Sequence, residues 1–146
     1  MTDTIPQFGR KWADEVCKER TYAFVIIQDG RNRVALKRIE GAKHLLPGCL
    51  IEDDEDKEDA IIHKIKEDTG LEIELKTVVG AANEYVELED GSTGNDIGTF
   101  YSAVISDSGP SSKKSLKKLD WYTADTVTSA VNRRSHIWAI SKMLYQ

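Results

Sequence analysis

The sequence predicts an α/β protein in which helices cover both faces of a mixed β-sheet. Segments with strand character alternate with helical segments along the chain, and two of the strand segments form a local hairpin. The 146 residues, 40% hydrophobic and 31% charged, are enough for one complete core but too few for two typical domains. We therefore expect residues 1–146 to form a single domain that begins with an N-terminal arm over residues 1–20.

A β-hairpin is the first regular structure that the sequence predicts. β-Branched and aromatic residues cluster in Tyr22–Gln28, and the dipeptide at residues 29–30 is an Asp-Gly turn signal. Arg33–Arg38 is expected to pair back onto the first strand. The following segment, Lys43–Gly48, is apolar in its middle and closes with Pro-Gly, which is typical of a strand end that leads into a loop.

A helix over residues 56–69 has the clearest local signals in the chain. Asp56 can cap its N-terminus, and Ile61 and Ile65 recur at helical spacing after it. Gly70 stands where a left-handed residue commonly ends a helix.

The rest of the chain is expected to complete the sheet and to add one more helix. Leu71–Leu88 predicts one long strand or two short strands divided near Gly80, and Glu89–Asn95 predicts a polar loop. The remaining expected elements are a strand at Gly98–Ser106, a surface loop at Asp107–Lys118, a short strand at Leu119–Tyr122 and an amphipathic helix at Ser135–Leu144.

Composition excludes several classes of function. The net charge of -5 argues against a protein built to coat nucleic acid, and the basic cluster in Lys113–Lys118 lacks interleaved aromatic residues, so a solvated loop is expected there. The N-terminus does not resemble a signal peptide and no apolar run approaches the length of a membrane span, which predicts a cytoplasmic protein without a membrane partner. Cys17 and Cys49 lack metal-site spacing and are expected to be free thiols.

The stretch LPGCLIEDDEDKEDAIIHKIKEDTGL, residues 46–71, resembles the Nudix box. In that family a loop Glu is followed after seven residues by an Arg-Glu pair and then by two acidic residues on the same helix. Glu55 occupies the loop position, and seven residues separate it from His63. Glu67 and Asp68 occupy the later acidic positions. The resemblance extends over most of residues 20–145, because the hairpin before the box and the strand and helix after it also match.

This resemblance implies a Nudix-type α/β/α sandwich that hydrolyses a nucleoside diphosphate linked to another group. Mg²⁺ or Mn²⁺ is the implied cofactor, since such ions neutralise the charge of a pyrophosphate attacked by water. The implied metal ligands are the carbonyl of Gly48 and the carboxylates of Glu67 and Asp68, and the implied catalytic residues are Glu55, Glu67 and Asp68. Residues 64, 67 and 68 share one face of a helix.

The sequence departs from the box at positions that matter for catalysis. Lys64 stands where the family has Glu, which changes the local charge by two units, and each unit at roughly 4 Å is worth about 4 kcal/mol at an effective dielectric of 20. His63 replaces the Arg that pairs with the loop Glu, and Cys49 replaces a glycine. We therefore expect metal-dependent hydrolysis to be weakened or lost.

Three functions remain open from the sequence alone. The first is a pyrophosphohydrolase of the nucleoside-diphosphate-X type with reduced activity. The second is a non-catalytic module that binds a nucleotide or another diphosphate-containing molecule through Lys64, Arg38 and His63. The third is a scaffold that uses the fold for protein contacts. No pattern indicates an oligomeric state.

Overall fold

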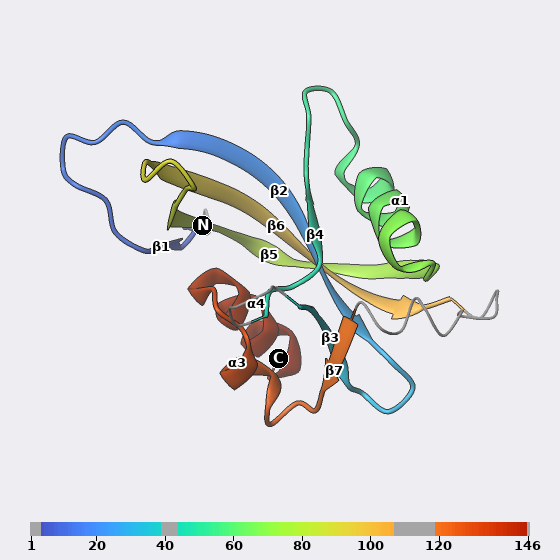
Figure 1. Cartoon of the computed structure of the whole chain (residues 1–146). Coiled ribbons are helices and arrows are strands. Elements are labelled where there is room, and N and C mark those ends of the chain that lie inside the picture. Colours follow the sequence, from blue (N-terminus) through green and yellow to red (C-terminus); the bar gives the residue numbers. More distant parts are fainter. Residues whose placement is uncertain (1–3, 39–43, 107–118, 146) are drawn as a thin grey trace.

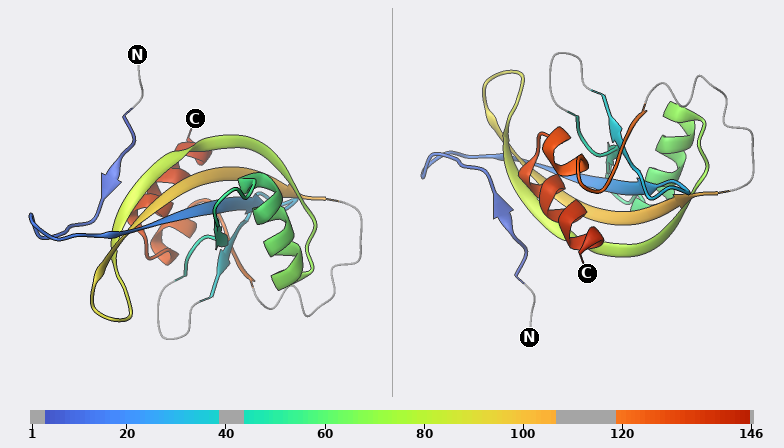
Figure 2. Two further views of the ribbon diagram at one scale, coloured as in Figure 1. Left: turned by 90° about the horizontal axis from the view of Figure 1, so that it is seen from above. Right: turned by 90° about the horizontal axis from the view of Figure 1, so that it is seen from below.

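The computed structural model describes residues 4–38, 44–106 and 119–145, and these form three layers. A strongly curved sheet separates helix α1 (Lys57–Thr69) from helices α3 (Val127–Ala130) and α4 (Arg134–Leu144) (Figures 1 and 2). The expectation of a mixed sheet covered on both faces is confirmed. No helix in the described part of the chain is long and apolar enough to cross a membrane.

Within the described residues the sheet has the strand order β1-β5-β6-β2-β3-β7, and β4 also pairs with β2. Strands β2 and β6 run parallel, whereas β5 pairs antiparallel with β6, so the sheet is mixed. The strands are β1 (Gln7–Phe8), β2 (Lys18–Gln28), β3 (Val34–Lys37), β4 (Gly48–Leu50), β5 (Ile73–Glu87), β6 (Thr93–Ile105) and β7 (Leu119–Tyr122).

Strand β2 is buried on both faces and divides the core into two clusters. Its side chains alternate between the faces, as the period of a strand requires. Val25 and Ile27 pack with Ile61 of α1 on one face. Phe24 and Ile26 pack on the other face among residues of α4. The near-continuous apolar run of this strand is therefore the pattern expected for a strand covered on both sides.

The turn of the predicted hairpin is closed by one carboxylate. Asp29 Oδ1 accepts hydrogen bonds from the backbone N–H groups of Arg31 and Arg33 at 2.9 and 2.8 Å. Asn32 has a φ of 60°, a conformation that Asn tolerates better than most residues. The hairpin prediction is confirmed, with β2 and β3 pairing antiparallel.

Helix α1 begins and ends where the sequence predicts. The side chain of Asp56 accepts a hydrogen bond from the backbone N–H of Glu58, and Gly70 has a φ of 75° and donates its N–H to the carbonyl of Lys66. Glycine is favoured at this C-terminal position because it adopts the left-handed conformation without a Cβ penalty.

Two predicted loop boundaries are wrong. Lys43–Gly48 was expected to end a strand, but Gly48 begins β4 instead, and the carbonyl of Pro47 accepts from Val25 N at 3.0 Å. Proline lacks an N–H but keeps its carbonyl, so it can stand directly before an edge strand.

The polar loop expected over Glu89–Asn95 is also shorter than predicted, because β6 begins at Thr93. Gly91, with a φ of 85°, closes a tight turn in which Leu88 N donates to the Ser92 carbonyl. The polar side chain of Asn95 is buried in the sheet, where its Oδ1 accepts a hydrogen bond from Gln7 Nε2 at 3.0 Å.

The N-terminal arm takes part in the sheet, which the sequence did not indicate. Gln7 and Phe8 form β1 against β5, and residues 18–20, assigned to the arm, belong to β2. The short helix α3 was likewise not predicted. The surface loop predicted at Asp107–Lys118 lies entirely outside the described residues.

A buried carboxylate caps helix α4. Glu84 of β5 is 7% exposed, and its side chain accepts hydrogen bonds from the backbone N–H groups of Arg134 and Ser135 and from Ser135 Oγ. These N–H groups have no partner within the helix, and the positive end of the helix dipole favours an anion there. Glu84 thus fixes α4 to the sheet.

A buried histidine completes the α4 side of the core. His136 is 2% exposed, and its ring packs against Phe24 and Phe100. His136 Nδ1 accepts a hydrogen bond from Leu46 N at 3.2 Å. Burial lowers the pKa of His136 to about 3, and the charge of Arg133 acts in the same direction, so the imidazole is neutral in the folded protein.

Substitution Glu84→Ala should lower the free energy of unfolding by roughly 2 to 4 kcal/mol, because three donors lose a charged acceptor. Urea unfolding measures this loss. The exposed Glu87→Ala, on the same strand, is the control and should stay within about 0.5 kcal/mol of the parent protein. Equal stabilities for the two variants would show that Glu84 does not hold α4.

The free energy of unfolding should decrease as pH is lowered below 6.5, because of His136. The unfolded state binds a proton below a pKa of 6.5, whereas the folded state resists protonation until about pH 3, so the stabilisation is complete above pH 6.5 and is lost as pH falls. Between pH 7 and pH 5 the loss should be roughly 2 kcal/mol greater than in His136→Asn, which keeps an acceptor for Leu46 N but does not titrate. Urea unfolding of both proteins at the two pH values measures these losses. An equal loss of unfolding free energy in the parent protein and in His136→Asn would contradict the prediction.

Candidate functional site on helix α1

The side chains predicted to form a site on α1 are arranged as two ion pairs along the helix. His63 Nε2 lies 3.3 Å from Glu67 Oε2, and Lys64 Nζ lies 3.4 Å from Asp68 Oδ1. Both pairs have the i,i+4 spacing that brings side chains together on consecutive turns. Each acidic residue of the predicted metal site on α1 therefore has a basic partner one turn earlier.

The two pairs differ in exposure. The side chains of His63 and Glu67 are 80% and 62% exposed, whereas those of Lys64 and Asp68 are 41% and 37% exposed. The second pair therefore lies closer to the packed side of the helix, where Ile61 and Ile65 enter the core. Lys64 and Asp68 are half-exposed at the margin of this packed side, and His63 and Glu67 face solvent.

The thiol of Cys49 in β4 is influenced by the charges of three predicted site residues. Its pKa is raised, chiefly by burial and then by the charges of Glu55 and Asp68, while Lys64 opposes them. Glu55, Lys64 and Asp68 thus all act on one thiol, although they come from a loop and from two turns of a helix. Cys49 is a free thiol, as expected.

The loop that carries Glu55 is closed by its own hydrogen bonds. Glu55 Oε1 accepts from Glu52 N at 2.7 Å, and Glu55 N donates to the Glu52 carbonyl at 3.1 Å. Asp54 has a φ of 67°, which gives the loop its tight bend. Glu55 and His63 form no ion pair within the described residues, where His63 pairs with Glu67 instead.

Gly48 is required by close packing. A Cβ at this position would lie 2.4 Å from Phe24 Cδ1 and 2.9 Å from the carbonyl of Ala23. The hydrogen bonds of the β2–β4 pair are made by the neighbouring odd-numbered positions, so the carbonyl of Gly48 is turned away from β2. Cys49 does not have a positive φ, and a side chain there causes no backbone strain.

The residues present do not fit a divalent cation well. Across residues 4–38, 44–106 and 119–145, no group of three or more His, Cys, Asp or Glu side chains is arranged to hold a metal ion. Glu67 and Asp68 each have a basic partner, and an ammonium lies where a third carboxylate would be needed. The assignment of Gly48, Glu67 and Asp68 as metal ligands therefore stays a prediction.

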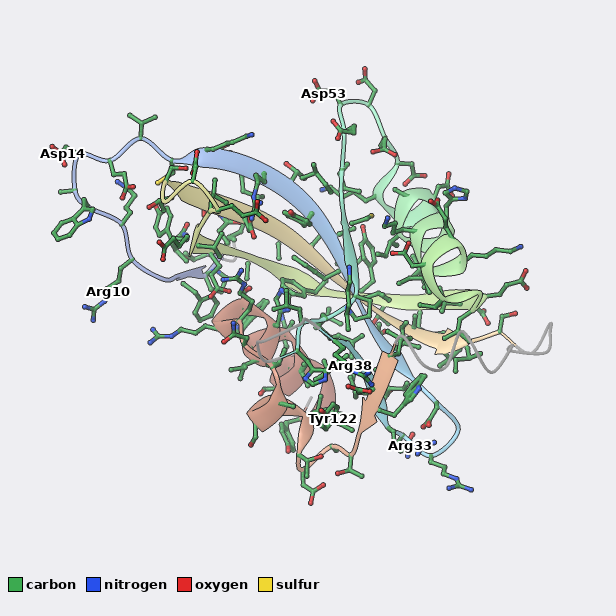
Figure 3. All side chains as sticks on the ribbon, viewed as in Figure 1. Arg10, Asp14, Arg33, Arg38, Asp53 and Tyr122 are labelled. Atoms are coloured by element: carbon green, nitrogen blue, oxygen red, sulfur yellow. The ribbon has the colours of Figure 1, made fainter. Side chains whose placement is uncertain are left out.

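Arg38 belongs to a different cluster. Its guanidinium donates to both carboxylate oxygens of Asp120, which also contacts His44 Nε2. The hydrogen bond from Arg38 is the largest cause that lowers the pKa of Asp120 to about 2, with burial opposing it and His44 adding to it. Figure 3 shows Arg38 near Tyr122 at the β3–β7 side, well away from Asp53 at the tip of the acidic loop. The predicted role of Arg38 in binding substrate at α1 gains no support.

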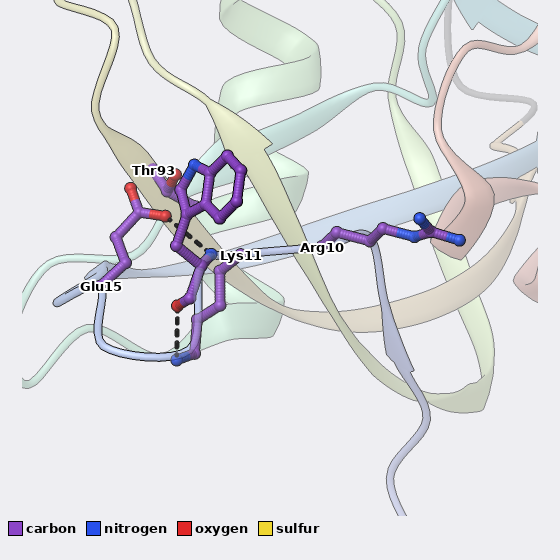
Figure 4. Close-up of a pocket in the computed structure, with 5 residues that line it drawn as sticks. Arg10, Lys11, Glu15 and Thr93 are labelled. Atoms are coloured by element: carbon purple, nitrogen blue, oxygen red, sulfur yellow. Dashed lines mark hydrogen bonds between the residues drawn. The ribbon is translucent and has the colours of Figure 1, made fainter.

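Sequence reasoning missed one pocket altogether. A cavity of about 380 Å³ is lined by Arg10, Lys11, Trp12, Glu15 and Thr93, residues of the N-terminal arm and the start of β6 (Figure 4). The signal that could have found it is the consecutive Arg-Lys-Trp at residues 10–12, in a segment that otherwise has few apolar residues.

Comparison with known proteins identifies the fold. No family model matches the chain, and no curated protein matches it. Among solved structures, a Nudix hydrolase from Nitrosomonas europaea superposes with a TM-score of 0.67 at 15% identity, covering 87% of this chain and 89% of that one.

Two MutT proteins are similar to the same extent. The MutT protein from Methanosarcina mazei Go1 gives a TM-score of 0.65 at 15% identity, over 89% of this chain and 98% of that one. The mutator MutT protein from Bacillus halodurans gives 0.62 at 18% identity, over 87% and 83%. The chain therefore has the Nudix fold, an α/β/α sandwich with a mixed sheet, as the resemblance implied.

Proposed function

We propose that this chain binds a nucleoside diphosphate linked to another group at the surface formed by α1 and β4, and that metal-dependent hydrolysis there is weakened or lost. Three observations support the proposal. The fold is that of the Nudix hydrolases and MutT proteins. The loop Glu, the helix and the terminal glycine keep the family spacing. The charges of Glu55, Lys64 and Asp68 all act on the thiol of Cys49.

The pairing of Lys64 with Asp68 carries the second half of the proposal. A carboxylate that holds Mg²⁺ must offer its oxygens to the ion, and here one of them is 3.4 Å from an ammonium. A divalent cation brought to this place would also be repelled by that ammonium, at a cost of about 4 kcal/mol for each of its two charges at 4 Å and an effective dielectric of 20. Divalent metals should consequently bind weakly.

Residual hydrolysis would depend on the remaining carboxylates, Glu55, Glu67 and Asp68. Glu55 forms no salt bridge with a described residue, so it is the carboxylate of this set best able to accept a proton from water. A bound Mg²⁺ or Mn²⁺ would supply charge neutralisation for the diphosphate.

A non-catalytic binding module is the second candidate, and the geometry of Lys64 favours it. The 3.4 Å distance to Asp68 exceeds the 2.7 to 2.9 Å of strong charge-assisted hydrogen bonds, and the side chain is 41% exposed. A phosphate could therefore take the ammonium from Asp68. His63 stands one residue earlier on the same exposed surface and would add a second donor when protonated.

Substitution Lys64→Glu should create or raise Mg²⁺- or Mn²⁺-dependent hydrolysis of nucleoside diphosphate compounds, on the order of 10- to 1000-fold, because it replaces a repelling charge by a ligand. Release of a nucleoside monophosphate from a panel of such compounds measures the change. His63→Arg combined with Lys64→Glu should raise the rate further by restoring the pair with Glu55.

Lys66→Glu is the matched control, since it introduces the same charge change on the same helix in an exposed ion pair with Glu72. It should leave the rate unchanged. If Lys64→Glu and the double variant both stay inactive, Lys64 is not what limits catalysis.

Binding without turnover should be detectable when divalent metal is removed. At a ligand concentration near 100 Kd, a nucleoside diphosphate compound should stabilise the parent protein by about 2.7 kcal/mol in the presence of a chelator. Lys64→Gln should reduce this stabilisation, and Lys66→Gln should keep it in full. Thermal unfolding with and without ligand tests both statements, and equal ligand shifts in the two variants would exclude a role for Lys64 in binding.

A further inference from the structure

The pocket of the N-terminal arm lies at the opposite end of the sheet from α1. Figures 1 and 2 show the arm beyond one end of β2, β5 and β6, whereas α1 covers the other end. The pocket is open to solvent and its volume of about 380 Å³ is within the usual range for small-molecule sites. A ligand bound here would not reach the residues whose charges act on Cys49.

The wall of this pocket is a hydrogen-bonded turn. Trp12 N donates to Glu15 Oε1 at 3.2 Å, and Glu15 N donates to the Trp12 carbonyl at 3.0 Å. A hydrogen bond with the Thr93 side chain is the largest cause of the lowered pKa of Glu15, so the carboxylate also ties the turn to β6. The arm therefore presents Trp12 from a fixed backbone rather than from a free tail.

Trp12 offers an almost bare aromatic face. The residue is 80% exposed, although an indole is among the side chains that gain most from burial. Neither of the other two tryptophans is fully exposed, since Trp121 and Trp138 pack against the two cores. An exposed indole on a fixed turn is suited to stack on the flat face of a ligand.

The two cations beside Trp12, Arg10 and Lys11, form no salt bridge within the described residues, although the charge of Lys11 helps to lower the pKa of Glu15. Lys11 Nζ reaches only the carbonyls of Trp12 and Ala13, at 3.4 and 3.5 Å. Figure 4 shows the Arg10 side chain extending away from both Glu15 and Lys11, so Arg10 has to turn towards the pocket to hold an anion there. A planar anionic ligand would then stack on the indole and pair with Lys11 and with the reoriented Arg10.

We propose that this pocket binds a nucleoside phosphate, with the base stacked on Trp12 and the phosphates held by Arg10 and Lys11. Stacking on aromatic side chains is tolerant of base identity, and the two cations match a mono- or diphosphate. The net charge of -5 opposes binding of a long polyanion, and the cavity volume suits one nucleotide. This site is additional to the one proposed on α1 and does not depend on it.

The test is titration with ADP, adenosine and inorganic pyrophosphate by calorimetry and tryptophan fluorescence. It uses the full chain with Lys64→Gln and a chelator, so that binding at α1 and metal effects do not contribute. ADP should bind, quench fluorescence and weaken as salt is raised. Adenosine and pyrophosphate should each bind on the order of 10-fold more weakly than ADP, because each satisfies only half of the pocket.

Variants of the arm separate stacking from charge. Trp12→Leu should weaken ADP binding on the order of 10-fold, whereas Trp12→Phe should retain most of the affinity but lose the quenching. Arg10→Gln and Lys11→Gln should weaken ADP but not adenosine. The controls are Val16→Ser, 92% exposed on the same arm, and Arg31→Gln on the β2–β3 turn, and neither should change the affinity.

Four results would overturn the proposal: no binding of ADP, an affinity for pyrophosphate equal to that for ADP, an unchanged affinity in Trp12→Leu, or tighter binding of a single-stranded oligonucleotide per occupied site. Failure of the site on α1 would leave the first three measurements unaffected, because they are made with Lys64→Gln.

Discussion

The burial of β2 on both faces is the constraint on which the remaining structure depends. A strand with no exposed face needs a layer on each side, and α1 and α4 supply these layers. One edge of β2 pairs with β6 along its whole length, and the other edge is shared between β4 and β3. The division of that second edge places Gly48 and Cys49 under α1, so the position of the candidate site follows from how β2 is paired.

Carboxylates show how the same group serves different purposes in this chain. Asp56 and Glu84 each accept backbone N–H groups at a helix N-terminus, where the dipole favours negative charge. Asp68 instead has an ammonium as its partner, and Glu55 has a backbone N–H of its own loop. Only the charges of the last two act on the thiol of Cys49. The negative charge near this thiol is partly neutralised by Lys64.

The sequence predicted the elements whose signals are local. The cap at Asp56, the left-handed Gly70 and the Asp-Gly turn depend on neighbouring residues, and the structure confirms each of them. Other features depend on contacts between residues far apart in the chain, and no local pattern predicted them. They are the start of β4, the pairing of β1 with β5 and the cap of α4 by Glu84. The same distinction applies to the candidate site residues. The positions of Glu55 and Asp68 were predicted from their spacing in one short segment, whereas the partner of Arg38, Asp120, comes from the distant strand β7.

The positive charge of Lys64 separates two properties of the segment from Glu55 to Gly70: its family-like spacing and its ability to support catalysis. The fold is shared at about 15% identity with the solved Nudix structures, because it depends on core packing and on close contacts such as the one between Gly48 and Phe24. Catalysis depends instead on a few charges that the core does not constrain. An exposed Glu-to-Lys difference costs the fold little, and here Asp68 compensates for it through an ion pair of the kind worth less than about 1 kcal/mol. The fold can thus persist unchanged while the chemistry of the site is altered, and this is why the fold alone does not establish hydrolysis.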